Sequence, residues 1–116
     1  MTQNVVTADE ETSVIGVAKT MGGQRIGSVV ITRQDKPLGI FTERDLLTNF
    51  LAKGKALFTK VGPECSQPLT MIPAGTSVHR AAATMALKHI RRLPIVRDDK
   101  LIGIITARDL VEAYAK

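Results

Sequence analysis

The sequence of 116 residues, 44% of them hydrophobic, has the size of one compact domain, and no apolar run approaches the length of a membrane span. Its single cysteine, Cys65, excludes an intramolecular disulfide and has no partner ligands at zinc-like spacing. The chain start lacks the pattern of a signal peptide, so we expect a protein of the reducing cytoplasm. The net charge of +5 favours anionic partners, namely nucleotides, nucleic acid or an acidic protein.

The chain repeats itself at a distance of 64 residues. Residues 12–46 align with residues 76–110 without a gap, and seventeen of the aligned positions are identical. Each copy is near the lower size limit for burying a sufficient core alone. We therefore expect an α/β (α+β) fold in which the two copies pack through their sheets about an approximate two-fold axis.

In the first copy we expect a strand, a helix, a hairpin and a second helix. The first helix begins at Thr12, and its apolar residues follow the spacing of a half-buried helix until two glycines end it. The remaining predictions are an extended segment over 4–7, a polar turn over 8–11, β-branched strands over 28–32 and 38–41 with a turn over 33–36, and a last helix from Thr42 to about residue 52.

The second copy predicts the same order, which makes the unit β-α-β-β-α. The expected elements are an extended segment over 68–71, a turn over 72–75, a helix from Thr76, strands over 93–96 and 101–105 with a turn over 97–100, and a helix from Thr106 to about residue 115. We divide the chain into a first repeat (1–52), a linker (53–67) and a second repeat (68–116). Prolines keep the linker irregular, with a short helical turn expected near 58–61.

Both copies carry Gly-Ile-apolar-Thr-x-Arg-Asp-Leu where the last strand meets the last helix. The Thr, at 42 and 106, and the Asp, at 45 and 109, have the spacing of a capping box, which stabilises a helix start. The same geometry suits a ligand, because a helix N-terminus attracts phosphate and a carboxylate accepts hydrogen bonds from a ribose diol. Gly39 and Gly103 would let another group approach the strand. The spacing alone leaves capping and binding open.

Together these segments resemble a tandem pair of CBS domains, often called a Bateman module. The Gly-apolar-apolar-Thr-x-x-Asp signature appears twice, and residues 5–14 and 69–78 are similar to the opening segment of the family. The run Arg-Arg-Leu-Pro-Ile-Val over 91–96 resembles the basic-basic-apolar-Pro-Val-Val strand of the family. The resemblance covers roughly residues 3–115, since the order and the spacing of the segments agree in both copies.

The resemblance implies a regulatory module that binds AMP, ADP, ATP or S-adenosylmethionine in clefts between the repeats, with no catalysis and no required cofactor. By this resemblance the signature Asp holds the ribose and the signature Thr lies near ribose or phosphate, while the opening segments contact adenine. The implied site residues are Asp45 and Asp109 for ribose, Thr42, Thr106, Arg44, Arg108, Arg91 and Arg92 for ribose or phosphate, and Thr7, Ala8, Met71 and Ile72 for adenine.

The two copies differ at the basic pair. Arg91 and Arg92 align with Gly27 and Ser28, so a phosphate-bearing ligand should favour the pocket that the arginines face, and we expect two unequal sites. The orientation of Arg44 and Arg108 stays open between solvent, phosphate and a neighbouring chain. Family members usually pair, which implies a homodimer, and a regulated effector domain or protein is a further implied partner.

Two other functional classes remain alternatives. The basic run over 88–92 suits a nucleic-acid patch, although the sequence shows no helix-turn-helix pattern and no RNA-binding aromatic signature. A structural dimerisation module would use the same fold without a ligand. An enzyme is disfavoured because no nucleophile, base and acid can be assembled from distinct positions, and His79 and His89 lack the companions of a metal site.

Overall fold

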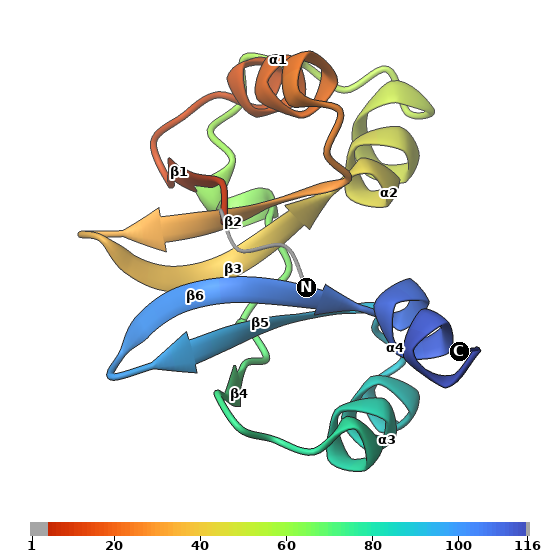
Figure 1. The fold of residues 1–116 in the computed structure, drawn as a ribbon. Coiled ribbons are helices and arrows are strands. Elements are labelled where there is room, and N and C mark those ends of the chain that lie inside the picture. Colours follow the sequence, from red (N-terminus) through yellow and green to blue (C-terminus); the bar gives the residue numbers. More distant parts are fainter. Residues whose placement is uncertain (1–4, 116) are drawn as a thin grey trace. The chain divides into compact units, whose positions relative to one another are not determined.

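The computed structural model describes residues 5–115, which fold as two compact units (Figure 1). The first unit is Val6–Leu69, and the second is residues 70–115 together with Val5. The first unit contains β1 (Thr7–Asp9), α1 (Val14–Gln24), β2 (Ser28–Arg33), β3 (Lys36–Thr42), α2 (Glu43–Asp45), the π-helix η1 (Leu46–Leu51) and the 3₁₀ turn η2 (Gly62–Glu64). The second unit contains β4 (Ile72–Pro73), α3 (Val78–Lys88), β5 (Arg92–Arg97), β6 (Lys100–Thr106) and α4 (Ala107–Tyr114). The predicted α/β class and the β-α-β-β-α order of each unit are confirmed.

Each unit has a three-stranded sheet with the same topology. In the first unit β1 runs parallel to β2, and β2 runs antiparallel to β3; β4, β5 and β6 repeat this arrangement. Both antiparallel pairs shift register at the same place, between Ile31 and Thr32 and between Ile95 and Val96. The duplication therefore extends to an irregularity of the backbone, which is evidence that the two units are built on one plan.

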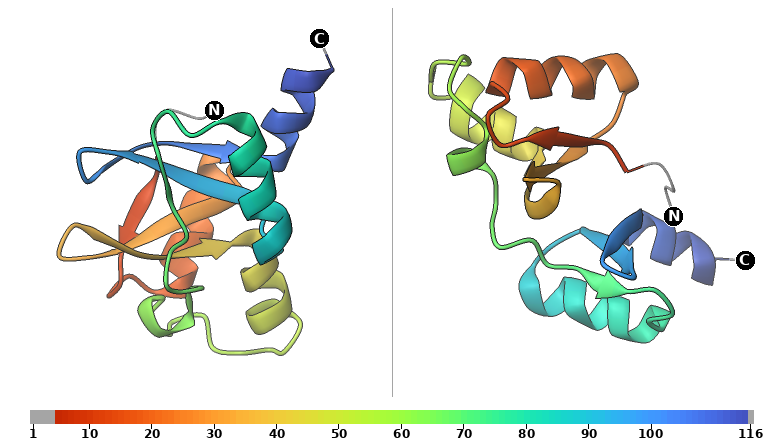
Figure 2. Two further views of the ribbon diagram at one scale, coloured as in Figure 1. Left: turned by 90° about the horizontal axis from the view of Figure 1, so that it is seen from below. Right: turned by 90° about the vertical axis from the view of Figure 1, so that its left-hand side faces the viewer.

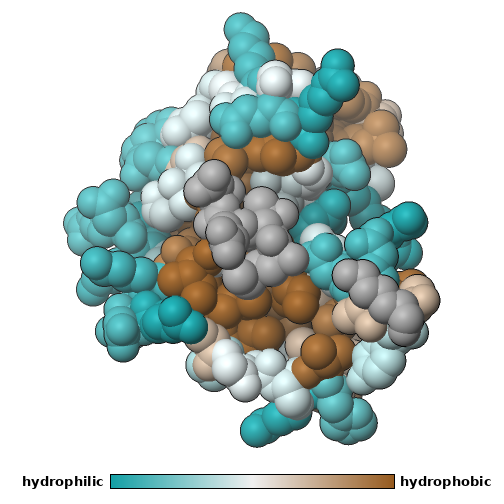
Figure 3. All heavy atoms as spheres, viewed as in Figure 1, coloured by the Kyte–Doolittle hydropathy of each residue, from teal (hydrophilic) through white to brown (hydrophobic). Residues whose placement is uncertain are grey.

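The two hairpins turn on two residues each, as the polar segments predict. Gln34 and Asp35 have φ values of 51° and 64°, and Asp98 and Asp99 have 51° and 63°. Two successive residues with positive φ fit the twist of the flanking strands. The hairpin tips form hydrophilic surface, coloured teal on the left-hand side of Figure 3.

A buried apolar cluster lies between the helices and one face of the sheet in each unit. In the first unit Val14, Val17 and Met21 of α1 pack with residues of both long strands. Ala81 and Met85 of α3 play this part in the second unit, together with Leu93 and Leu110. The predicted helical faces are thus confirmed, and Ser13 and Ser77, one residue later than expected, provide the N-caps.

The opening strands lie later in the chain than the sequence indicated. We expected extended segments at 4–7 and 68–71, whereas β1 begins at Thr7, the last residue of the expected segment, and continues into the predicted turn, and β4 lies wholly inside its predicted turn, at Ile72–Pro73. Residue 4 lies outside the described residues. Pairing with β2 fixes this position, since Thr7 is in register with Val30 and the amide of Glu10 donates to the carbonyl of Thr32 at 2.9 Å. Tertiary pairing has overridden local composition here.

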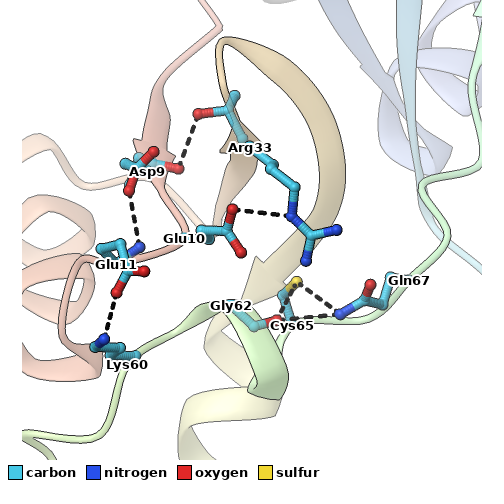
Figure 4. A network of polar contacts seen from close by, with 10 residues as sticks. Asp9, Glu10, Glu11, Arg33, Lys60, Gly62, Cys65 and Gln67 are labelled. Carbon is cyan, nitrogen blue, oxygen red and sulfur yellow. Dashed lines mark hydrogen bonds and ion pairs between the residues drawn. The ribbon is translucent and has the colours of Figure 1, made fainter.

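The segment 53–67 packs in the first unit. Its helical turn is η2, rather than the expected turn near 58–61. Figure 2 shows this green segment passing the start of α1, where the carbonyls of Leu57 and Thr59 accept hydrogen bonds from α1 amides. The ion pair of Glu11 with Lys60 adds a further attachment (Figure 4). The division into repeat, linker and repeat stays a prediction.

Candidate functional site

Both signature Thr–Asp pairs form complete capping boxes. In the first unit the backbone N–H of Thr42 donates to Oδ2 of Asp45 at 2.9 Å, and the Asp45 N–H donates to Oγ1 of Thr42 at 3.2 Å. The corresponding distances in the second unit, between Thr106 and Asp109, are 2.9 Å and 3.1 Å. The structural role that the sequence left open is therefore present in both copies.

Capping does not seal these side chains away from a ligand. All four residues are partly exposed, and each capping box engages the Oδ2 atom of its carboxylate. The backbone N–H of Thr106 is the main reason why the pKa of Asp109 lies below its ordinary value. The carboxylate is thus ionised at neutral pH, and an ionised carboxylate is a stronger hydrogen-bond acceptor than a neutral acid.

The strand register places the signature threonines on the sheet face that points away from the helices. Val29 and Ile31 face the helical core, so Ser28 and Val30 point to the opposite side, as does Thr42, the cross-strand partner of Ser28. We call this opposite side the distal face of the sheet. It is defined by Ser28, Val30, Ile40 and Thr42 in the first unit and by Arg92, Pro94, Ile104 and Thr106 in the second.

Arg92 and Thr106 are direct cross-strand neighbours on the distal face of the second unit. They occupy paired positions in the register of β5 and β6, and Arg92 is half-buried. The equivalent pair of the first unit is Ser28 and Thr42, which carries no cation. The replacement of Ser28 in the first copy by Arg92 in the second therefore lies beside the signature threonine, and it adds a positive charge there.

The other candidate arginines differ in position. Arg91 is exposed and lies just before β5, and its carbonyl accepts a hydrogen bond from the Ala107 N–H at 2.8 Å. Arg44 is exposed on α2. Arg108 is also exposed and pairs with Glu112 one turn later, with 3.1 Å between Nε and Oε1. The orientation that we left open for Arg108 is therefore toward its own helix.

The opening segments contribute to both faces of their sheets. Thr7 pairs with Val30 and so belongs to the distal face, where its side chain is exposed, and Met71 precedes β4 with an exposed side chain. The side chains of Ala8 and Ile72 pack on the cores of their units. These two side chains are therefore not available for the adenine contact that the resemblance implies, and the Ala8 carbonyl already accepts from the Thr32 hydroxyl at 3.4 Å.

Gly39 does provide a close approach, but its neighbour is the chain itself. The Ile40 N–H donates to the Ser66 carbonyl at 3.0 Å, and the Ser66 N–H donates back at 2.9 Å. A Cβ added at Gly39 would lie 2.4 Å from the Ser66 carbonyl oxygen. Our expectation of a ligand beside Gly39 is replaced by a contact with segment 53–67. The sequence signal for this contact was the Gly itself, which does not identify its neighbour.

A solvent-open hollow of about 480 Å³ lies at the other end of the second sheet, between the β4–α3 connection and the tip of the β5–β6 hairpin. Gly75, Arg97, Asp98 and Asp99 contribute to its lining, and none of the predicted site residues does. In the described part of the chain no three His, Cys, Asp or Glu side chains are grouped as they would be around a metal ion. None of the helices described has the length and the apolar character needed to cross a membrane.

Comparison with known proteins finds a family described as CBS domain, whose sequence model matches residues 1–52 and 61–116. The uncharacterized protein MK0525 of Methanopyrus kandleri is 38% identical over 95% of this chain and 58% of its own length. The CBS domain-containing protein YhcV of Bacillus subtilis is 31% identical over 95% of this chain and 79% of its own. The chain thus spans little more than half of the Methanopyrus relative.

Solved structures agree with the fold. A signal-transduction protein with CBS domains from Burkholderia ambifaria has a TM-score of 0.88 at 26% identity, covering 97% of this chain and 83% of that chain. The CBS domain protein PAE2072 from Pyrobaculum aerophilum, whose structure is complexed with AMP, has a TM-score of 0.85 at 26% identity, covering 100% of this chain and 95% of that chain.

Proposed function

The chain belongs to the CBS domain family, and from this premise we propose that it is a regulatory module that binds an adenosine nucleotide and catalyses no reaction. The observation that carries the proposal is the pairing of Arg92 with Thr106 on the distal face, next to the carboxylate of Asp109. A guanidinium, a hydroxyl and an ionised carboxylate at one end of the β5–β6 pair are the groups that a nucleotide phosphate and ribose require.

In the second unit we assign the ribose hydroxyls to Asp109 and the phosphate to Arg92, with Thr106 near both. A carboxylate accepts hydrogen bonds from two adjacent hydroxyls, and a guanidinium donates two parallel hydrogen bonds to a phosphate. In the first unit Asp45 has the same capping geometry, and Ser28 replaces the arginine. We therefore propose that phosphorylated ligands prefer the second site and that the first site binds more weakly.

We propose that the opening strands recognise adenine. Hydrogen bonds alternate along a strand, and the carbonyl of Val6 accepts from β2 while the amide of Glu10 donates to it. The backbone N–H and C=O of Thr7 consequently point away from β2, at the edge of the sheet. Donor and acceptor groups on one edge match the polar edge of adenine, and the corresponding residue in the second unit is Met71.

The AMP complex of PAE2072 supports this ligand class, since that protein matches the chain over its whole length. We propose AMP, ADP, ATP and S-adenosylmethionine as the ligands to test. We also propose a homodimer, in which the exposed side chains of Leu47, Leu51 and Val111 provide apolar contact, and an effector domain or protein that responds to the ligand.

Isothermal titration calorimetry tests the proposal. The four ligands and adenosine are titrated into the wild-type protein and into Arg92→Ala, with Arg97→Ala as the matched control, because Arg97 is an exposed arginine at the other end of β5. Loss of a charge-assisted hydrogen bond should weaken AMP by about tenfold or more. Adenosine should bind both arginine variants as tightly as it binds the wild type.

Two results would overturn the proposal at different levels. If none of the adenine ligands gives a binding heat, the proposal of nucleotide binding is wrong. If Arg92→Ala weakens the affinity for AMP and for adenosine equally, only the assignment of Arg92 to phosphate is wrong.

A further inference from the structure

The two signature Thr–Asp pairs have the same geometry, so they cannot by themselves distinguish one ligand from another. The two hydrogen bonds of the first capping box are 2.9 and 3.2 Å long, and those of the second are 2.9 and 3.1 Å long. Asp45 and Asp109 are both partly exposed. The ribose contact that we propose is therefore the same in both units, and selectivity must come from the side chains around it.

Three positions lie around each signature pair, and backbone contacts fix them there. The N–H of Glu43, the first residue of α2, donates to the Gly27 carbonyl at 3.0 Å, and the Ala107 N–H donates to the Arg91 carbonyl at 2.8 Å. The residue that follows the carbonyl, at position 28 or 92, is the cross-strand partner of the signature threonine. The three positions are thus equivalent in the two units.

These three positions carry opposite charges in the two units. The first unit has one carboxylate and no cation there, whereas the second has two guanidinium groups and no carboxylate. The residues are Gly27, Ser28 and Glu43 in the first unit and Arg91, Arg92 and Ala107 in the second. Because Coulomb interactions at a protein surface extend over several ångströms, ligands at the two signature pairs meet different electrostatic fields.

The other charged side chains nearby reduce this difference but do not cancel it. Arg44 and Arg108 are exposed at equivalent positions, and the segment before each hairpin carries one cation, Arg25 in the first unit and Lys88 in the second. Glu112, whose counterpart in the first unit is uncharged, opposes the difference and pairs with Arg108. The second unit therefore stays more positive than the first around its signature pair.

We propose that the signature pair of the first unit selects adenosine derivatives whose 5′ substituent is neutral or cationic, and that Glu43 determines this selection. The assignment presupposes the nucleotide-binding function proposed above. A 5′ phosphate carries about two negative charges at neutral pH, and the carboxylates of Glu43 and Asp45 repel it. S-adenosylmethionine carries a sulfonium and an ammonium group against one carboxylate, so these carboxylates attract it. The first site thus takes a different ligand class and is not a weaker copy of the second.

Isothermal titration calorimetry on the intact chain separates the two classes. AMP and S-adenosylmethionine are titrated into the wild type, Asp45→Ala and Asp109→Ala. Loss of the ribose acceptor should weaken the ligand of that unit by about tenfold or more. We therefore expect Asp45→Ala to lose S-adenosylmethionine and to keep AMP, and Asp109→Ala to lose AMP and to keep S-adenosylmethionine.

Glu43→Gln tests the charge itself and leaves both residues of the capping box in place. The matched ligand is S-adenosylhomocysteine, which lacks the methyl group that makes the sulfur of S-adenosylmethionine cationic. The variant should reduce the preference for S-adenosylmethionine over S-adenosylhomocysteine by about threefold, the factor expected for two unit charges about 6 Å apart in water.

Asp35→Asn is the control, because it removes one exposed carboxylate at the far end of the same hairpin. Asp35 has a φ of 64°, which asparagine also adopts readily. This variant should keep the wild-type preference between the two sulfur ligands.

Two results overturn the selection by Glu43 and leave the nucleotide-binding function standing, provided that the wild type binds AMP. The first is that S-adenosylmethionine does not bind the wild type or binds Asp45→Ala equally well. The second is that Glu43→Gln keeps the wild-type preference for S-adenosylmethionine over S-adenosylhomocysteine. If the wild type binds none of the ligands, both the selection and the nucleotide-binding function are wrong.

Discussion

Substitution of Gly39 tests how segment 53–67 is held in the first unit. The Cβ of Gly39→Ala would lie 2.4 Å from the Ser66 carbonyl oxygen and 2.8 Å from the Cys65 sulfur, both closer than real Cβ contacts. Backbone must move, because the Ser66 oxygen is not the end of a flexible side chain. Overpacking of this kind costs about 1–3 kcal/mol.

The movement should also weaken the two backbone hydrogen bonds between Ile40 and Ser66. Each such bond contributes about 0.5–1.5 kcal/mol to the free energy of unfolding. Alanine recovers about 0.4–1 kcal/mol by restricting the unfolded chain. The net loss in the free energy of unfolding should therefore be about 2–3 kcal/mol. In urea, with a slope of about 2 kcal/mol per molar, the midpoint should fall by about 1 M.

Equilibrium urea unfolding followed by circular dichroism measures this loss, and Gly23→Ala is the control. Gly23 lies in α1, and an added Cβ there meets nothing within 4 Å. Alanine should stabilise the helix at this position by about 0.5–1 kcal/mol. If Gly39→Ala unfolds at the wild-type urea concentration, or if both variants shift in the same direction, the account of the contact is wrong.

The remaining predictions concern the ionisable groups. The lowered pKa of Asp109 means that its carboxylate contributes stability above the pKa of the unfolded chain, and this contribution disappears as the pH falls through the folded-state pKa. Asp109→Asn should thus cost about 0.5–1 kcal/mol at pH 7 and much less near pH 3, as urea midpoints across this range will show. Burial raises the pKa of the Cys65 thiol; the native protein should therefore react with a disulfide reagent at pH 8 at least about tenfold more slowly than the urea-unfolded chain, and similar rates would contradict the burial of Cys65.

Features that follow from local residue pattern were predicted from the sequence in both copies. The helical faces and the hairpin turns follow from local periodicity and from polar residues, and Asp35 and Asp99 show this for the turns. The capping boxes were recognisable at Thr42 and Thr106, because Thr and Asp stand three residues apart in both copies.

Contacts between distant segments could not be predicted from local pattern. The opening strands shifted because parallel pairing with β2 and β5 decides their position. The neighbour of Gly39 could not be predicted, because a glycine indicates a close contact but does not identify the group that makes it. The resemblance places Ile72 at adenine, and its side chain packs in the core cluster of the second unit; the adenine contact stays a prediction.

The central claim is that the two helix starts, already capped by Thr and Asp, also hold an adenosine nucleotide. A crystal structure grown with AMP tests this most directly. The account predicts density for AMP with the ribose hydroxyls on the carboxylate of Asp109 and the phosphate beside Arg92. Nucleotide density remote from both Asp45 and Asp109 would contradict it.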